Sequence, residues 1–146
     1  MYLNDITVKA KWEISENAVA KIGEEYYERL LKDLKEAKEY ILIEYFIISD
    51  GKMWNEIYEI LKEKRKQNVK IYIMFDALGS LFKKPKDLKE QLEEANIDYL
   101  AFNPLTTFIR SYINYRDHRK IVVIDGKVGY TGGINIGDEY INLTHR

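Results

Sequence analysis

The chain has 146 residues and a formal net charge of −1, from 23 basic and 24 acidic side chains. Its length suits a single domain, and its 46% hydrophobic and 32% charged residues indicate a folded globular protein rather than a disordered one. The balanced charge argues against a long nucleic-acid footprint. Because the chain has no cysteine, disulfides and cysteine-based zinc sites are excluded. No apolar run approaches the roughly 18 residues that span a bilayer.

Strand patterns and helix patterns alternate along the chain. β-Branched and aromatic runs indicate the strands, apolar residues at helical spacing indicate the helices, and Pro85 suits the first turn of the third helix. In chain order the predicted elements are a strand at 6–8, a helix at 27–37, a strand at 40–48, a helix at 54–68, a strand at 69–75, a helix at 85–95, a strand at 97–102, an irregular segment at 103–115 and a hairpin at 120–131. This alternation predicts a single α/β domain over residues 1–146, with a mixed, mostly parallel sheet flanked by helices.

The C-terminal hairpin has a strong local signal. Asp125-Gly126 lies between two apolar runs, and this dipeptide is typical of a type I′ turn. With these two residues at the centre of the turn, the predicted opposite pairs are Ile124 with Lys127, Lys120 with Thr131, His118 with Gly133 and Arg116 with Asn135. The residues predicted to share one face of the hairpin are His118, Lys120, Thr131, Gly133 and Asn135.

That face would carry groups suited to attack on phosphorus. A neutral imidazole at His118 can act as a nucleophile. Lys120 can neutralise the non-bridging phosphate oxygens, and Asn135 can donate a hydrogen bond to them. Gly133 has no side chain and would leave room for the phosphate. This chemistry needs no metal and no other cofactor.

The motif and its flanking blocks resemble a known family. The spacing His118-x-Lys120-x4-Asp125-x6-Gly132-Gly133-x-Asn135 is similar to the HxKxxxxD…GGxN signature of the phospholipase D superfamily, called the HKD motif. The blocks at 43–47, 75–80, 114–120 and 132–140 look like those of bacterial cardiolipin synthases. The resemblance implies a phospholipase D-like half-domain with the motif on its C-terminal hairpin. It would be the first of two such domains in a longer enzyme, of which this chain is a truncated piece.

The resemblance also implies a function. The full enzyme would transfer a phosphatidyl group between two phosphatidylglycerol molecules at the bacterial cell membrane, giving cardiolipin and glycerol. His118 would form a phosphohistidine intermediate or protonate the leaving group. Lys120 and Asn135 would bind the phosphate, and Asp125 would be a mainly structural member of the catalytic motif.

The same resemblance sets the expected partners. They are phosphatidylglycerol or another anionic phospholipid, a membrane surface, and a second HKD domain in the same chain or in a second subunit. Nucleic acid is not expected as a partner. Alone, the chain is expected to be a soluble fragment with an incomplete active site.

Polar residues outside the motif leave alternatives open. Glu44 interrupts an apolar strand and is either a paired carboxylate, with Arg116 as its candidate partner, or part of the substrate site together with Arg116. Asp76 either caps the turn that follows its strand, which we favour, or lies at the site. The stretch 105–112 either faces lipid or packs on the sheet. The lysine-rich helix face at 62–66 is expected to be solvated.

Two other functions also fit the sequence. The first is a homodimeric phosphodiesterase or nuclease in which each subunit supplies one motif. The second is a catalytically silent module that binds anionic lipid, for which vesicle binding should survive the substitution His118→Ala. Phosphatidylglycerol turnover that appears when the missing half is supplied would favour the synthase over both.

Overall fold

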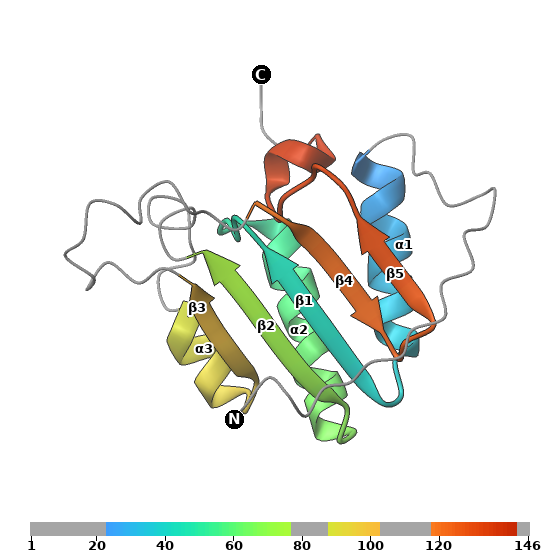
Figure 1. Ribbon diagram of the computed structural model, residues 1–146, viewed down its shortest axis with the longest axis vertical. Coiled ribbons are helices and arrows are strands. Elements are labelled where there is room, and N and C mark those ends of the chain that lie inside the picture. The colour runs from blue at the N-terminus through green and yellow to red at the C-terminus, as the bar shows by residue number, and fades with distance from the viewer. Residues whose placement is uncertain (1–22, 77–87, 103–117, 143–146) are drawn as a thin grey trace.

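A five-stranded sheet organises the residues that the computed structural model describes, which are 23–76, 88–102 and 118–142 (Figure 1). The elements in chain order are α1 (Gly23–Glu36), β1 (Tyr40–Tyr45), α2 (Lys52–Lys66), β2 (Lys70–Asp76), α3 (Leu88–Glu94), β3 (Asp98–Phe102), β4 (Lys120–Ile124), β5 (Val128–Thr131) and a 3-10 helix, η3 (Asp138–Ile141). The strand predicted at 6–8, Pro85 and the segment predicted at 103–115 lie outside the described residues.

The strand directions confirm the predicted mixed sheet. The strand order is β3-β2-β1-β4-β5. β1 pairs parallel with β2, and β2 pairs parallel with β3, whereas β4 is antiparallel to both of its neighbours, β1 and β5. β5 therefore runs in the same direction as the first three strands, and β4 alone is reversed.

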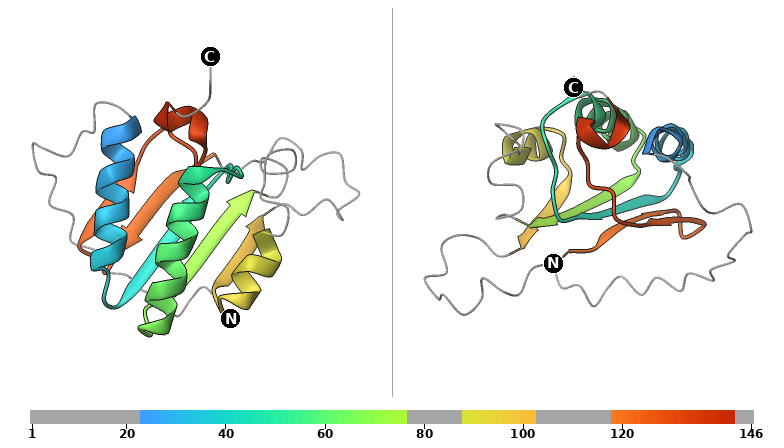
Figure 2. Two further views of the ribbon diagram at one scale, coloured as in Figure 1. Left: turned by 180° about the vertical axis from the view of Figure 1, so that it is seen from behind. Right: turned by 90° about the horizontal axis from the view of Figure 1, so that it is seen from above.

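The described helices lie on one face of this sheet (Figure 2). The β1-α2-β2 and β2-α3-β3 crossovers step in the same direction across the sheet, and right-handed crossovers of that kind place both helices on the same side. β1 buries alternate residues toward this layer, namely Ile41, Ile43 and Tyr45. On β4 the same face carries Val122 and Ile124, which pair with Ile43 and Ile41.

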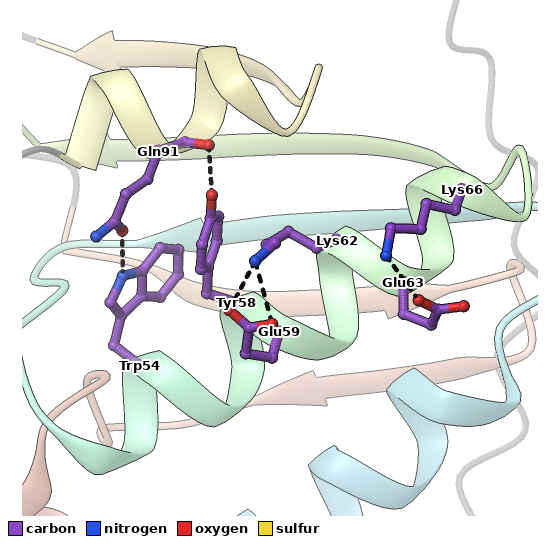
Figure 3. Close-up of polar contacts among 7 residues, drawn as sticks. All are labelled: Trp54, Tyr58, Glu59, Lys62, Glu63, Lys66 and Gln91. Carbon is purple, nitrogen blue, oxygen red and sulfur yellow. Dashed lines mark hydrogen bonds and ion pairs between the residues drawn. The ribbon is translucent and has the colours of Figure 1, made fainter.

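Two aromatic residues of α2 form hydrogen bonds with α3, which lies beside it (Figure 3). Trp54, which is fully buried, donates its indole N–H to the side-chain oxygen of Gln91 at 3.0 Å. The Tyr58 hydroxyl donates to the backbone carbonyl of the same glutamine at 2.7 Å. The short helix α3 is therefore held by polar contacts as well as by its buried residues Leu88 and Leu92.

The lysine-rich face of α2 is solvated at its outer positions, as predicted. Lys62 and Lys66 pair with Glu59 and Glu63, one turn earlier on the exposed surface (Figure 3). Lys64 is the exception, because it is buried and donates its Nζ to the carbonyl oxygen of Ala37 at 2.9 Å. The prediction of a wholly solvated face was therefore wrong at this position. Ala37 directly follows the last residue of α1, and carbonyl groups at the end of a helix have no hydrogen-bond donor within the helix. Lys64 supplies that donor to the Ala37 carbonyl.

We expect Lys64→Met to lower the free energy of unfolding by about 1.5 kcal/mol, because it leaves that buried carbonyl without its donor while keeping the packing of the alkyl chain. Urea denaturation followed by tryptophan fluorescence measures the change. The matched control is Lys66→Met, whose side chain is 72% exposed and which should change stability by less than about 0.5 kcal/mol. Equal effects of the two substitutions would contradict a structural role for Lys64.

The hairpin has the predicted strands but not the predicted register. Asp125 and Gly126 both have positive φ, 53° and 64°, as a type I′ turn requires. The pairing nevertheless begins with Ile124 opposite Val128, so Lys127 is an extra residue in the loop. The predicted pairing of Lys120 with Thr131 was therefore wrong by one residue, because Thr131 pairs with Ile121. Thr131 lies on the opposite face of the hairpin from Lys120.

Candidate active site at the carboxyl edge of the sheet

His118 and Lys120 lie where β4 begins, beside the end of β1. The Cα of Lys120 pairs with that of Tyr45, the last residue of β1. Because β1, β2 and β3 are parallel, their carboxyl ends share this edge of the sheet, which is where open α/β sheets place their ligands.

The side chains of His118 and Lys120 meet, as the two-residue spacing predicts. The Lys120 Nζ lies 2.9 Å from Nδ1 of the imidazole and donates to the carbonyl oxygen of His118 at 2.6 Å. Lys120 is 4% exposed, whereas His118 is exposed at the surface. An ammonium group can only donate, so a hydrogen bond from Nζ in this arrangement would use Nδ1 as the acceptor.

Asn135 is buried and anchors the glycine-containing segment to the chain that follows β1. Its Oδ1 accepts from the backbone N–H of Ile47, and its Nδ2 donates to the Tyr140 hydroxyl, each at 3.2 Å. Nδ2 carries two hydrogens, and the Tyr140 hydroxyl accepts one of them.

The backbone strengthens this anchor. Ile48 and Ile136 form a parallel bridge, and the Ser49 N–H donates to the Ile136 carbonyl at 2.8 Å. We call residues 46–49 the strap, because they join the end of β1 to the segment that carries Asn135.

Asp138 caps the start of α2, a structural role that its sequence context did not predict. Its carboxylate accepts the backbone N–H groups of Lys52 at 2.9 Å and Met53 at 2.8 Å, which are the first two residues of α2. A side chain from a distant segment thus replaces the usual N-cap residue. Gly51 makes this possible, because a Cβ built there would lie 2.6 Å from a carboxylate oxygen of Asp138. The acidic residue two positions after Ile136 was visible in the sequence, but its target 86 residues away was not.

Asp125 lies at the opposite end of β4 from Lys120. Its carboxylate accepts the backbone N–H groups of Lys38, Glu39 and Tyr40 at 2.8, 2.8 and 2.9 Å. Burial alone would raise the pKa of this carboxyl, but the three hydrogen bonds outweigh it and hold the pKa below its usual value. The geometry places Asp125 as a clamp between the hairpin turn and the loop that precedes β1.

Three further candidate residues are described by the structure, and a fourth is not. A carboxylate oxygen of Glu44 lies 2.8 Å from Nε of Arg119, so the two side chains form an ion pair. Arg116, its candidate partner, lies outside the described residues. Gly133 is exposed, and a methyl group added there would meet nothing within 4 Å, so packing does not demand glycine. Asp76 is 1% exposed at the end of β2, and the turn that it was expected to cap lies outside the described residues.

Two further findings concern membrane spans and metal sites among the described residues. None of these helices is long and apolar enough to cross a membrane. In the same ranges, no three His, Asp or Glu side chains gather in a way that could hold a metal ion.

Comparison with known proteins places this site in a family context. Residues 30–145 match the family described as "Cardiolipin synthase, PLD-like domain". The chain is 45% identical over 120 residues to "Cardiolipin synthase 2" of Bacillus cereus, covering 82% of this chain and 23% of the relative. It is 44% identical over 124 residues to an uncharacterized protein of Streptococcus mutans, covering 85% of this chain and 27% of the relative. The chain thus spans about a quarter of the length of these relatives.

Solved structures share the fold at low sequence identity. NucT from Helicobacter pylori superposes with a TM-score of 0.64 over 84% of this chain and 74% of its own, at 16% identity. The phospholipase D family member Nuc from Salmonella typhimurium gives a TM-score of 0.59 over 80% of this chain and 68% of its own, also at 16% identity. At such identities the likeness concerns the fold alone, and it confirms the predicted fold class.

Proposed function

The chain belongs to the family of cardiolipin synthase, phospholipase D-like domains, and from that premise we propose that it is one half of a phosphatidyltransferase that acts on phosphatidylglycerol. The observation that carries the proposal is the contact of the Lys120 ammonium with the His118 imidazole at the carboxyl edge of the sheet. In this proposal a second HKD domain, in the same chain or in another subunit, supplies the facing half of the site, and both substrates reach it from a membrane surface.

The proposed reaction has two displacements at phosphorus. A lone pair of the His118 imidazole attacks the phosphorus of one phosphatidylglycerol, and a P–N bond forms as the bond to the glycerol oxygen breaks. The facing histidine gives a proton to that oxygen, and glycerol leaves. A hydroxyl of the second phosphatidylglycerol then attacks the phosphohistidine while the facing histidine takes its proton, and cardiolipin forms as the P–N bond breaks. If the facing histidine is the one that attacks, the roles of the two are exchanged.

The chain's own residues supply the electrostatic part of this chemistry. A phosphate carries charged oxygens, which compete with the imidazole for the donors of Lys120. When the ammonium turns to those oxygens, the imidazole lone pair that it contacts in the structure is released for attack. Asn135 offers its second amide hydrogen to the same oxygens from a position fixed by Ile47 and Tyr140.

A chimera tests the proposal. The matched 120-residue segment of the Bacillus cereus relative would be replaced by the corresponding residues of this chain. With phosphatidylglycerol vesicles, we expect cardiolipin and glycerol in equal amounts, whereas the 146-residue chain alone should give neither. A folded chimera that makes no cardiolipin, beside an active parent protein, would contradict the proposal.

A homodimeric phosphodiesterase is the second candidate. NucT and Nuc are chains only moderately longer than this one, so this fold occurs in proteins with room for one such domain per chain. Light scattering on the 146-residue chain distinguishes the two candidates. A stable dimer that cleaves bis(p-nitrophenyl) phosphate or DNA would favour the phosphodiesterase, and an inactive monomer would favour the half-enzyme.

A further inference from the structure

Phe46 contacts both members of the His118–Lys120 pair. Its ring centroid lies 4.8 Å from that of the imidazole, with an angle of 41° between the two planes. The Lys120 Nζ lies 5.5 Å from the centroid of the same phenyl ring. An aromatic face attracts both a neighbouring ring and a cation, so one half-buried side chain restrains two polar ones.

The position of Phe46 in the chain explains how it can do this. It is the first residue of the strap and follows Tyr45, whose Cα pairs with that of Lys120. The next residue, Ile47, donates its N–H to Asn135 and accepts the N–H of Ile136 at 3.3 Å. The ring of Phe46 therefore rests on the first half of the motif, while the adjacent backbone is hydrogen-bonded to the second half.

We propose that Phe46 is a positioning residue that holds the His118 imidazole against Lys120 and sets both relative to Asn135. The proposal rests on the proposed role of His118 as a reacting group. His118 is exposed and precedes β4, so the ladder does not fix its side chain. The His118 imidazole could rotate away from Lys120 about two side-chain bonds, and the contact with the phenyl face of Phe46 limits that rotation. This restraint matters because small displacements of a reacting group lower the rate of turnover.

Histidine NMR on the 146-residue chain tests the contact without any substrate. The two histidines are His118 and His145, and a His145→Gln variant assigns their signals. In the unaltered chain, the His118 ring protons should show a ring-current displacement and cross-peaks to the Phe46 ring. Phe46→Leu should remove both, whereas Phe46→Tyr should keep the displacement. The matched control is Phe102→Leu, at a phenylalanine that is 39% exposed at the end of β3 and should leave the His118 signals unchanged.

Turnover of the chimera tests the positioning role. Phe46→Leu should lower kcat by about ten- to a hundredfold with KM within about twofold, because it misplaces the reacting groups while leaving lipid binding intact. Phe46→Tyr should restore most of the rate. A variant that merely loosened the fold would instead reduce the urea midpoint and shift many signals, and the tyrosine would have no special rescuing effect.

The outcomes separate this inference from the proposed function. His118 signals that do not change in Phe46→Leu would overturn the contact, and changed signals with unaltered kcat would overturn the positioning role. If the chimera with unaltered Phe46 makes no cardiolipin, the failure belongs to the proposed function. The NMR comparison then still decides whether Phe46 holds the imidazole.

Discussion

Replacing Lys120 with methionine in the chimera should lower the rate of cardiolipin formation by about a thousandfold, because in the proposed reaction it removes the cation that stabilises the phosphate oxygens as their charge grows. Methionine has a similar length and suits a position that is 4% exposed, so the substitution should keep the fold. The lost contacts are those of Nζ with the His118 carbonyl and with Nδ1 of its ring. Initial rates with phosphatidylglycerol vesicles, together with circular dichroism of the variant, measure the effect.

The double substitution sharpens this prediction. His118→Ala alone should be at least as damaging as Lys120→Met, and the two together should be little worse than His118→Ala, because groups that act as a unit are not additive. The control is Lys127→Met, an exposed lysine at the other end of the hairpin, which should leave the rate unchanged. Fully additive losses would indicate that Lys120 does not act on the phosphate group that His118 attacks.

Local patterns predicted the elements of the sheet well. The bounds of β4 and β5 agree with the predicted hairpin strands, and the alternation of strands and helices gave the mixed sheet. β1 ends at Tyr45, although the apolar run continues to Ile48. Residues 46–48 leave the sheet because their backbone forms hydrogen bonds with Asn135 and Ile136 and not with a neighbouring strand. An apolar run indicates burial in both cases, so it could not predict where the strand ends.

The candidate site was only partly predictable for the same reason. The two-residue spacing of His118 and Lys120 correctly predicted that their side chains meet, because that relation is local. The register differs from the prediction because Lys127 belongs to the loop. Asp125, in the same loop, accepts hydrogen bonds from backbone more than 80 residues away, and no rule for two-residue turns contains such a contact. Phe46 and Asp138 also contact residues more than 70 positions away in the chain, so neither has a local signal beyond its residue type.

Asp125→Ala should lower the free energy of unfolding by about 3 kcal/mol, because it leaves three backbone N–H groups without their charged acceptor. The φ of 53° at this position adds to the cost, since alanine tolerates the left-handed region poorly. Asp125→Asn keeps that tolerance and one acceptor oxygen, so it should cost about half as much. Asp98→Ala, at an exposed aspartate at the start of β3, serves as the matched control and should change stability by less than about 0.5 kcal/mol.

The pH dependence of this loss identifies its cause. The three hydrogen bonds to the carboxylate hold the pKa of Asp125 in the folded state below its ordinary value of 3.8. A carboxyl with a depressed folded-state pKa stabilises the fold fully above the unfolded-state pKa, and the contribution disappears as the pH falls through the folded-state pKa. The stability gap between the unaltered chain and Asp125→Asn should therefore be constant from pH 7 to about pH 5 and shrink below about pH 4.

Urea denaturation at each pH, with the buried Trp54 as a fluorescent reporter, measures that gap. A gap that stays the same down to pH 2 would mean that shape rather than charge holds the turn against the loop before β1.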